Sequence, residues 1–240
     1  MSIVMVIPVR NESAIIKDNV SEVIKFMKSS GIKDWHILVA ENGSTDDTVE
    51  KLKKLSNKYP KKILSYQCLH VKSKGDAIKM AWLSRKADVY IHMDADLSTD
   101  LKHIPELVGG IEDGNDVVVG SRYLKDSEVE RSLKRSVISF FYNTFMRTMF
   151  SLNVKDLQCG FKAINKKTLD EIVRQSRYLS DGFLDTEMLI LASKKKFRIK
   201  EIPIKWKDDR KSKFNLLSVS LKFFANALRV KRDLMLGRYE

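Results

Sequence analysis

The sequence lacks several features that would place it in other classes of protein. No run of about 18 apolar residues occurs among its 240 residues, so we expect no transmembrane helix. Its two cysteines, Cys68 and Cys159, are far apart, which favours unpaired thiols in a reducing compartment over a disulfide or a metal site. Four scattered histidines lack the spacing of a zinc site. The chain begins with a strand-like run instead of a signal peptide, so we expect a cytoplasmic protein.

The chain is strongly basic, with a formal net charge of +13. A basic chain can bind nucleic acid, anionic lipid or anionic substrates. This one has no nucleic-acid recognition motif and no basic stripe rich in aromatic residues, so we expect no nucleic-acid partner. Its length, without internal repeats or low-complexity stretches, fits a single α/β unit with a large core.

The N-terminal half alternates between apolar runs and helix-like segments. A strand-like run, a polar loop and a helical pattern follow one another four times, which predicts an α/β fold with a doubly wound, mostly parallel sheet. Because each polar loop follows a strand, the loops should gather at the edge of the sheet where such folds bind ligands. The expected strands are 3–8, 35–40, 63–70 and 89–93, the expected helices include 14–29 and 77–85, and the loops are 10–12, 41–46, 72–76 and 94–98.

The fourth strand ends in the sequence Asp94-Ala95-Asp96. Residues two apart on an extended chain point the same way, so both carboxylates can face one point. Carboxylates that lie close together repel each other unless a cation lies between them. Mg²⁺ and Mn²⁺ take oxygen ligands and often bridge carboxylates to phosphates, which predicts a metal site for a phosphate-bearing substrate. The tripeptide alone fits equally well a solvated turn in which the aspartates cap a helix near Thr99.

Several collinear motifs resemble one enzyme family. In the N-terminal half they are Ile-Pro-Val-Arg-Asn-Glu at 7–12, Ala-Glu-Asn-Gly-Ser-Thr-Asp at 40–46, Lys-Gly-Asp-Ala at 74–77 and Asp-Ala-Asp-Leu-Ser at 94–98. Their order resembles the family 2 glycosyltransferases, which have the GT-A fold, a mixed and mostly parallel sheet flanked by helices. In the second half the chain is similar to the dolichol-phosphate, or polyprenyl-phosphate, glucosyl- and mannosyltransferases, at 119–123, 156–162, 181–184, 202–204 and 212–213.

The resemblance covers about residues 3–213 and implies an activity. It implies transfer of glucose or mannose from a UDP- or GDP-sugar to a polyprenyl (dolichyl) phosphate, with inversion at the anomeric carbon and with Mg²⁺ or Mn²⁺ as cofactor. A family 2 transferase with a soluble glycan or protein acceptor is the alternative. A third interpretation is a non-catalytic nucleotide-binding module, against which the intact pair of Asp94 and Asp96 argues.

The resemblance also implies roles for individual residues. Asp94 and Asp96 would hold the metal, and the nucleotide sugar would be bound by Pro8, Arg10, Glu12, Glu41, Asn42, Lys74, Gly75, Asp94 and Ala95. Because an acceptor phosphate is already anionic near neutral pH, we expect cations and a hydroxyl group to position it: Arg122, Arg131, Arg210, Ser212 and Lys213. The predicted catalytic residues are Asp96, Arg122 and Asp185, with Glu187 as a further candidate for contact with the sugar or the acceptor. Solvated charges are the alternative for Lys74, Arg131 and Arg210, and exposed acids in a first helical turn for Asp185 and Glu187.

A few positions depart from the family pattern. Many members have two aspartates where this chain has Glu41 and Asn42, and a tyrosine or a small residue at the position of Arg10. The mannosyl-transferring members often carry a glutamine where this chain has Ser98. These departures leave undecided which sugar is transferred and whether the protein supplies a third ligand to the metal. They do not affect the prediction of the metal site itself.

Two segments combine aromatic and basic residues. Residues 131–152 mix phenylalanines and methionines with arginines and lysines, and residues 216–236 place apolar residues on one helical face beside basic ones. Basic amphipathic helices lie in the headgroup plane of anionic membranes, whereas an ordinary helix packs its apolar stripe on the domain. A lipid-linked acceptor favours the first interpretation, so we expect a peripheral protein on the cytoplasmic face of the membrane. We divide the chain into a GT-A domain, 1–213, and a C-terminal amphipathic helix packed on the domain or the membrane, 214–240.

Overall fold

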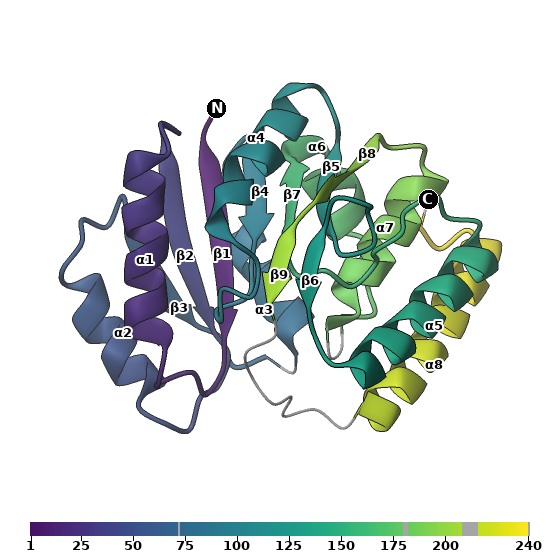
Figure 1. The fold of residues 1–240 in the computed structure, drawn as a ribbon, viewed down its shortest axis with the longest axis horizontal. Coiled ribbons are helices and arrows are strands. Elements are labelled where there is room, and N and C mark those ends of the chain that lie inside the picture. The colour runs from purple at the N-terminus through teal and green to yellow at the C-terminus, as the bar shows by residue number, and fades with distance from the viewer. Residues whose placement is uncertain (72, 180–181, 208–215, 240) are drawn as a thin grey trace.

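A mixed seven-stranded sheet runs through the middle of the molecule, with helices on both of its faces (Figure 1). The structure, a computed structural model, describes residues 1–71, 73–179, 182–207 and 216–239, with the side chains of the last range described from Lys222 onward. A second sheet of two short strands lies beside the main one.

The N-terminal half forms the parallel part of the main sheet. Its strands are β1 (Ile3–Val9), β2 (Trp35–Glu41), β3 (Leu64–Cys68) and β4 (Val89–His92), and the helices between them are α1 (Ile16–Ser29), α2 (Thr48–Ser56) and α3 (Lys74–Leu83). The strands lie in the order β3-β2-β1-β4, which confirms the doubly wound arrangement predicted from the sequence. α3 begins at Lys74 instead of Ala77, because the hydroxyl of Ser73 accepts a hydrogen bond from the backbone N–H of Asp76 and caps the helix.

The C-terminal half completes the sheet with strands of mixed direction. β5 (Val117–Ser121) and β8 (Ile199–Pro203) pair in parallel, while β7 (Lys162–Asn165) lies antiparallel between β4 and β5. The small sheet pairs β6 (Glu128–Glu130) with β9 (Lys205–Lys207). The helical elements of this half, apart from two described next, are η1 (Leu101–His103), α4 (Ile104–Glu112), α6 (Lys166–Thr168), η2 (Leu169–Val173) and α7 (Leu184–Lys194).

Two long helices lie side by side at one end of the molecule (Figure 1). They are α5 (Leu133–Phe150) and α8 (Leu216–Met235), and the rings of Phe145 and Phe224 are 5.2 Å apart between them. Within the ranges that the structure describes, no helix has both the length and the apolar content needed to cross a membrane.

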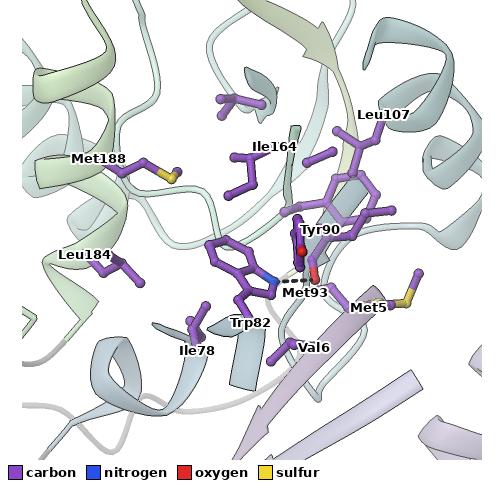
Figure 2. Close-up of a cluster of buried hydrophobic side chains, with 14 of the residues drawn as sticks. Met5, Val6, Ile78, Trp82, Tyr90, Met93, Leu107, Ile164, Leu184 and Met188 are labelled. Atoms are coloured by element: carbon purple, nitrogen blue, oxygen red, sulfur yellow. Dashed lines mark hydrogen bonds between the residues drawn. The ribbon is translucent and has the colours of Figure 1, made fainter. Parts of the chain in front are cut away.

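The core between the sheet and α3 contains residues of both halves of the chain. Trp82 is fully buried, and its indole nitrogen donates a hydrogen bond to the carbonyl oxygen of Ile91, at 3.2 Å. Figure 2 shows Trp82 of α3 close to Tyr90 of β4, with Leu184 of α7 nearby. His92 is also fully buried and packs edge-on against Trp82. This core fixes the starts of α3 and α7 relative to the end of β4.

The register of the parallel strands brings the polar loops together. Val9 at the end of β1 pairs with Glu41 at the end of β2, and Val6 pairs with His92 at the end of β4. The loops that follow these strands therefore leave the sheet at the same edge. This confirms the common loop edge predicted from the sequence.

Candidate active site

The loop after β4 presents two partly exposed aspartates, Asp94 and Asp96. The loop turns at Leu97, whose φ of 54° lies in the left-handed region. The side-chain amide of Asn19 donates a hydrogen bond to the carbonyl oxygen of Ala95, at 2.8 Å, and ties the loop to α1. The two carboxylates are thus presented on a braced loop at the ligand edge of the sheet.

The carboxylate of Asp94 is held from two sides. Its Oδ1 atom forms an ion pair with the ammonium group of Lys74, at the start of α3. Its Oδ2 atom lies against the backbone of Gly160, where an added Cβ would overlap with it. Burial opposes the charge of Lys74, but Asp94 outweighs burial, with help from Asp185 and Asp96, and raises the pKa of Lys74.

The atoms of this loop suit a divalent metal ion. Asp94 and Asp96 supply hard carboxylate oxygens, and Asp94 already attracts a cation, the ammonium group of Lys74. The Asp94 carboxylate occupies the space that a side chain at position 160 would fill, and Gly160 leaves that space free. The described parts of the chain contain no group of three or more His, Cys, Asp or Glu residues placed to hold a metal. Mg²⁺ or Mn²⁺ held here would therefore take its remaining ligands from phosphate groups and water.

In the second loop, the side chains of Glu41 and Asn42 both accept hydrogen bonds from backbone N–H groups. Glu41 is buried, and its Oε1 atom accepts a hydrogen bond from the backbone N–H of Ser44, at 2.5 Å. Asn42 is buried too, and its Oδ1 atom accepts one from the backbone N–H of Val71, at 3.2 Å. Both side chains therefore shape the loops in which a nucleoside would lie.

The first loop is tied directly to the second. The backbone N–H of Glu12 donates to the hydroxyl of Thr48, and that of Asn11 donates to the hydroxyl of Ser44, both at 2.9 Å. Arg10 extends into solvent between these contacts and the end of β1. The structure thus brings together the residues of these two loops that the sequence assigned to the nucleotide: Pro8, Arg10, Glu12, Glu41 and Asn42.

Gly75 is needed for the packing of α3. An added Cβ would overlap with the carbonyl oxygen of Leu179 and would lie 3.0 Å from the Cβ of Leu184. The hydroxyl of Ser73 donates a hydrogen bond to the same carbonyl, at 2.6 Å. The start of α3, including Lys74, is therefore locked against the segment that leads into α7, a role of Gly75 that the sequence did not indicate.

Two predicted acceptor residues meet at one tryptophan. The guanidinium groups of Arg122 and Arg131 lie 5.4 Å and 5.6 Å from the ring centroid of Trp206 in β9. The backbone N–H of Lys207 donates a hydrogen bond to the carbonyl oxygen of Ser98, at 2.8 Å, which ties β9 to the aspartate loop. Trp206 was missed from the sequence, where its signal is a single aromatic residue between two lysines.

Arg122 forms an ion pair with the buried carboxylate of Asp156. Its Nε and Nη2 atoms donate to the two carboxylate oxygens of Asp156, at 2.7 Å and 2.9 Å. Burial opposes ionisation of Asp156, but Arg122 outweighs it and holds the pKa of Asp156 below its usual range. Burial and the charge of Arg122 lower the pKa of Arg131, so an anion beside the pair would relieve this repulsion. The other predicted acceptor residues lie outside the described residues: Arg210, Ser212 and Lys213.

Asp185 and Glu187, in the first turn of α7, are both buried, so the alternative of exposed helix acids is wrong. The Oδ1 atom of Asp185 lies 3.1 Å from Nζ of Lys162 and 3.2 Å from Nε2 of His92. Burial opposes ionisation of Asp185, but Lys162 and His92 outweigh burial and hold its pKa below the usual range. The sequence analysis gave Lys162 no role, although it is the last residue of the family-like motif at 156–162.

Glu187 joins the C-terminal segment to α7. It accepts hydrogen bonds from the backbone N–H groups of Arg177 and Tyr178, each at 2.8 Å, and from the hydroxyl of Tyr239, at 2.7 Å. Burial raises the pKa of Glu187 in spite of these bonds. The contacts of Glu187 are thus those of a structural anchor.

A mixed sheet with nucleotide loops and a paired-aspartate loop at one edge is the architecture of the GT-A glycosyltransferases. The family model described as glycosyl transferase family 2 matches residues 4–173. The chain belongs to this family.

Individual relatives agree with this assignment. The chain is 31% identical to glycosyltransferase AglD of Haloferax volcanii. The match covers 94% of this chain but only 36% of the length of AglD. It is 28% identical to the dolichyl-phosphate beta-glucosyltransferase of Saccharomyces cerevisiae, over 98% of this chain and 75% of that protein. It is similar in fold to glucosyl-3-phosphoglycerate synthase of Mycobacterium tuberculosis in complex with Mn²⁺, UDP and phosphoglyceric acid, with a TM-score of 0.74 and 17% identity over 95% of this chain and 78% of that one.

The contact between Gly160 and Asp94 gives a first prediction. Gly160→Ala should weaken the binding of Mn²⁺ in the presence of UDP or GDP by about ten- to hundredfold, because the methyl group displaces the Asp94 carboxylate. Isothermal titration calorimetry measures this loss. Gly109→Ala is the matched control, because nothing lies within 4 Å of its added Cβ, and it should bind as the wild type does. Wild-type affinity in Gly160→Ala would show that the contact with Gly160 does not set the Asp94 carboxylate for metal binding.

The buried pair of Arg122 and Asp156 gives a prediction for pH. Because the pKa of folded Asp156 lies below its usual value of about 3.9, its contribution to the free energy of unfolding is full above that pH and is lost as the pH falls toward the folded pKa. Asp156→Asn should lower the free energy of unfolding by about 3–5 kcal/mol near pH 7, with a gap to wild type that narrows below about pH 4. Urea unfolding across this range measures the gap. The control is Asp113→Asn, in an exposed ion pair, which should change the free energy of unfolding by less than about 1 kcal/mol at every pH. A difference between Asp156→Asn and wild type that stays constant with pH would contradict the prediction.

Proposed function

We propose that this family 2 glycosyltransferase transfers a hexose, glucose or mannose, from a UDP- or GDP-sugar to a polyprenyl phosphate, with inversion. The observation that carries the proposal is the pair of Arg122 and Arg131 on Trp206, on a strand hydrogen-bonded to the loop of Asp94 and Asp96. This arrangement supports an acceptor phosphate bound by the two arginines beside a donor diphosphate bound at the aspartate loop. The names of two relatives, a dolichyl-phosphate beta-glucosyltransferase and a dolichol-phosphate mannosyltransferase of Pyrococcus furiosus, support the same acceptor.

The donor half of the proposed site consists of the aspartate loop and the two nucleotide loops. Asp94 and Asp96 would hold Mg²⁺ or Mn²⁺, which when bound screens the donor diphosphate and stabilises the departing nucleoside diphosphate. The ammonium group of Lys74 forms an ion pair with Asp94 and would add positive charge near the phosphates. The loops of Arg10 and Glu41 would enclose the nucleoside.

The acceptor half needs cations more than a strong base. A phosphate monoester is an anionic nucleophile near neutral pH, so no proton has to be removed before it attacks. One phosphate oxygen would form a bond to the anomeric carbon while the bond from that carbon to the diphosphate oxygen breaks, and the nucleoside diphosphate leaves from the opposite face. Arg131 would bind the phosphate, and Arg122, with its plane fixed by Asp156, would contribute its outward edge. Arg210, Ser212 and Lys213 remain proposed partners of the same phosphate.

A transfer assay tests this proposal. The wild type should transfer hexose from one member of a panel of UDP- and GDP-sugars to a polyprenyl phosphate, and Arg131→Ala should lower kcat/KM for the acceptor about ten- to hundredfold, because one charge-assisted contact is lost. Binding of the nucleotide by calorimetry should stay unchanged. Arg85→Ala, at an exposed position, is the control and should act as wild type. Transfer to a soluble glycan or protein but not to the lipid would contradict the proposed acceptor.

We further propose that α5 and α8 rest on an anionic membrane surface, where such an acceptor resides. Apolar side chains on both helices are exposed to a degree that is unusual for a packed helix, including Leu133 at 84%, Phe141 at 67% and Met235 at 74%. Exposed basic side chains, Lys134 and Lys231 among them, accompany these residues. Exposed apolar and basic groups together suit the interface of an anionic bilayer.

Vesicle co-sedimentation tests this surface. The wild type should bind vesicles that contain anionic lipid at low salt, and Phe140→Asp/Phe141→Asp should lower the partition coefficient at least about tenfold, because burial of each phenylalanine is worth about 1.5–3 kcal/mol. Met80→Asp, an exposed apolar position on α3, is the matched control and should bind as wild type. Equal binding by the double variant and the wild type would exclude this face of α5.

A further inference from the structure

Lys162 is a buried lysine near the proposed metal-binding loop of Asp94 and Asp96. Its side chain is 0% exposed, and it lies on β7 opposite His92 of β4. Its ammonium group donates a hydrogen bond to the carbonyl oxygen of Cys159 and lies 3.1 Å from Oδ1 of Asp185. The pair of Lys162 and Asp185 belongs neither to the nucleotide loops nor to the arginine pair, so the proposed chemistry gives it no role.

Stability does not explain why this pair is present. Desolvation of two charges commonly costs as much as their attraction returns, and apolar replacements of buried pairs are often neutral or stabilising. The geometry here is also imperfect, because Oδ1 of Asp185 lies within ion-pair distance of Lys162 and of His92 without the angles of a hydrogen bond to either. What the pair does supply is a fixed direction for the Lys162 ammonium group.

Lys162 is connected to Asp94 through the backbone of Cys159 and Gly160. Lys162 binds the carbonyl oxygen of Cys159, and the next residue, Gly160, is the one whose backbone lies against Oδ2 of Asp94. Lys74 forms an ion pair with Oδ1 of the same carboxylate. The rotation of the Asp94 carboxylate is therefore set by its contacts with Gly160 and Lys74, and a shift of the peptide between Cys159 and Gly160 would remove the first of these contacts.

We propose that Lys162, oriented by Asp185, is a positioning residue for the divalent cation: it fixes the Cys159 carbonyl, keeps Gly160 against Asp94 and thereby sets the Asp94 carboxylate for metal binding. This inference rests on the proposed function in that Asp94 is a metal ligand. Groups that orient a metal ligand from outside the coordination sphere alter metal affinity about ten- to hundredfold. Asp185 then acts through Lys162, without contact with the sugar.

Two double variants of the full chain test the proposal. Lys162→Met/Asp185→Asn removes both charges and the donor to Cys159, and should weaken the binding of Mn²⁺ at saturating UDP or GDP by about tenfold or more. Lys162→Gln/Asp185→Asn also removes both charges but keeps an N–H donor, and should recover most of the affinity. In both variants the thermal unfolding midpoint and the metal-free nucleotide affinity should stay close to wild type. The KM for Mn²⁺ should rise in the methionine variant while kcat at saturating Mn²⁺ is retained.

The control is a surface pair of the same length. Nζ of Lys200 and Oδ2 of Asp113 are also 3.1 Å apart, and Lys200→Met/Asp113→Asn should leave Mn²⁺ binding unchanged. If the methionine variant does not fold, Lys162→Met/Asp185→Leu takes its place, because an apolar pair avoids a buried amide without a partner.

The outcomes separate this inference from the proposed function. Wild-type affinity for Mn²⁺ in the methionine variant overturns the inference, and so does equal weakness of the methionine and glutamine variants, since the donor would then be irrelevant. A wild type that binds Mn²⁺ and nucleotide without transfer to polyprenyl phosphate overturns the proposed acceptor and leaves this test intact. A wild type that does not bind Mn²⁺ overturns both.

Discussion

The antiparallel pairing of β4 with β7 is the constraint on which the site depends. It joins the parallel strands of the N-terminal half to the strands of the second half and sets His92 opposite Lys162. From that register the chain before β7 reaches the loop after β4, so that Gly160 touches the carboxylate of Asp94. Without this ladder the Asp94 carboxylate would lose its contact with Gly160 and keep only the ion pair with Lys74.

Charge inside the molecule is arranged in pairs that orient groups at the site. Asp156 fixes the plane of Arg122, and Asp185 fixes the ammonium group of Lys162. Each pair is costly to bury, and each would be costlier still with one partner missing. The gain is geometric: a guanidinium group faces Trp206, and a backbone carbonyl is held beside the aspartate loop.

The layer of α5 and α8 is linked to the same region. The hydroxyls of Tyr142 in α5 and Thr186 in α7 are hydrogen-bonded at 2.8 Å, and the ring of Phe223 in α8 packs edge-on against Phe183, just before α7. Asp185 lies within this contact zone. A surface that rests on a bilayer would therefore be coupled through packed side chains to the segment that orients Lys162.

The sequence by itself determined the alternation of strands and helices, the common edge of the polar loops and the family, because apolar periodicity and short collinear motifs are local properties of the chain. It also placed Asp94 and Asp96 directly after a buried strand, although the tripeptide alone fits a solvated turn as well as a metal site. Only the tertiary structure decided what surrounds them. Gly160 and Lys162 belong to a motif at 156–162, but neither that motif nor the lone Trp206 shows which distant segment its residues contact. Asp185 is buried because α7 packs it against Lys162 of β7 and His92 of β4, which the sequence around Asp185 does not encode.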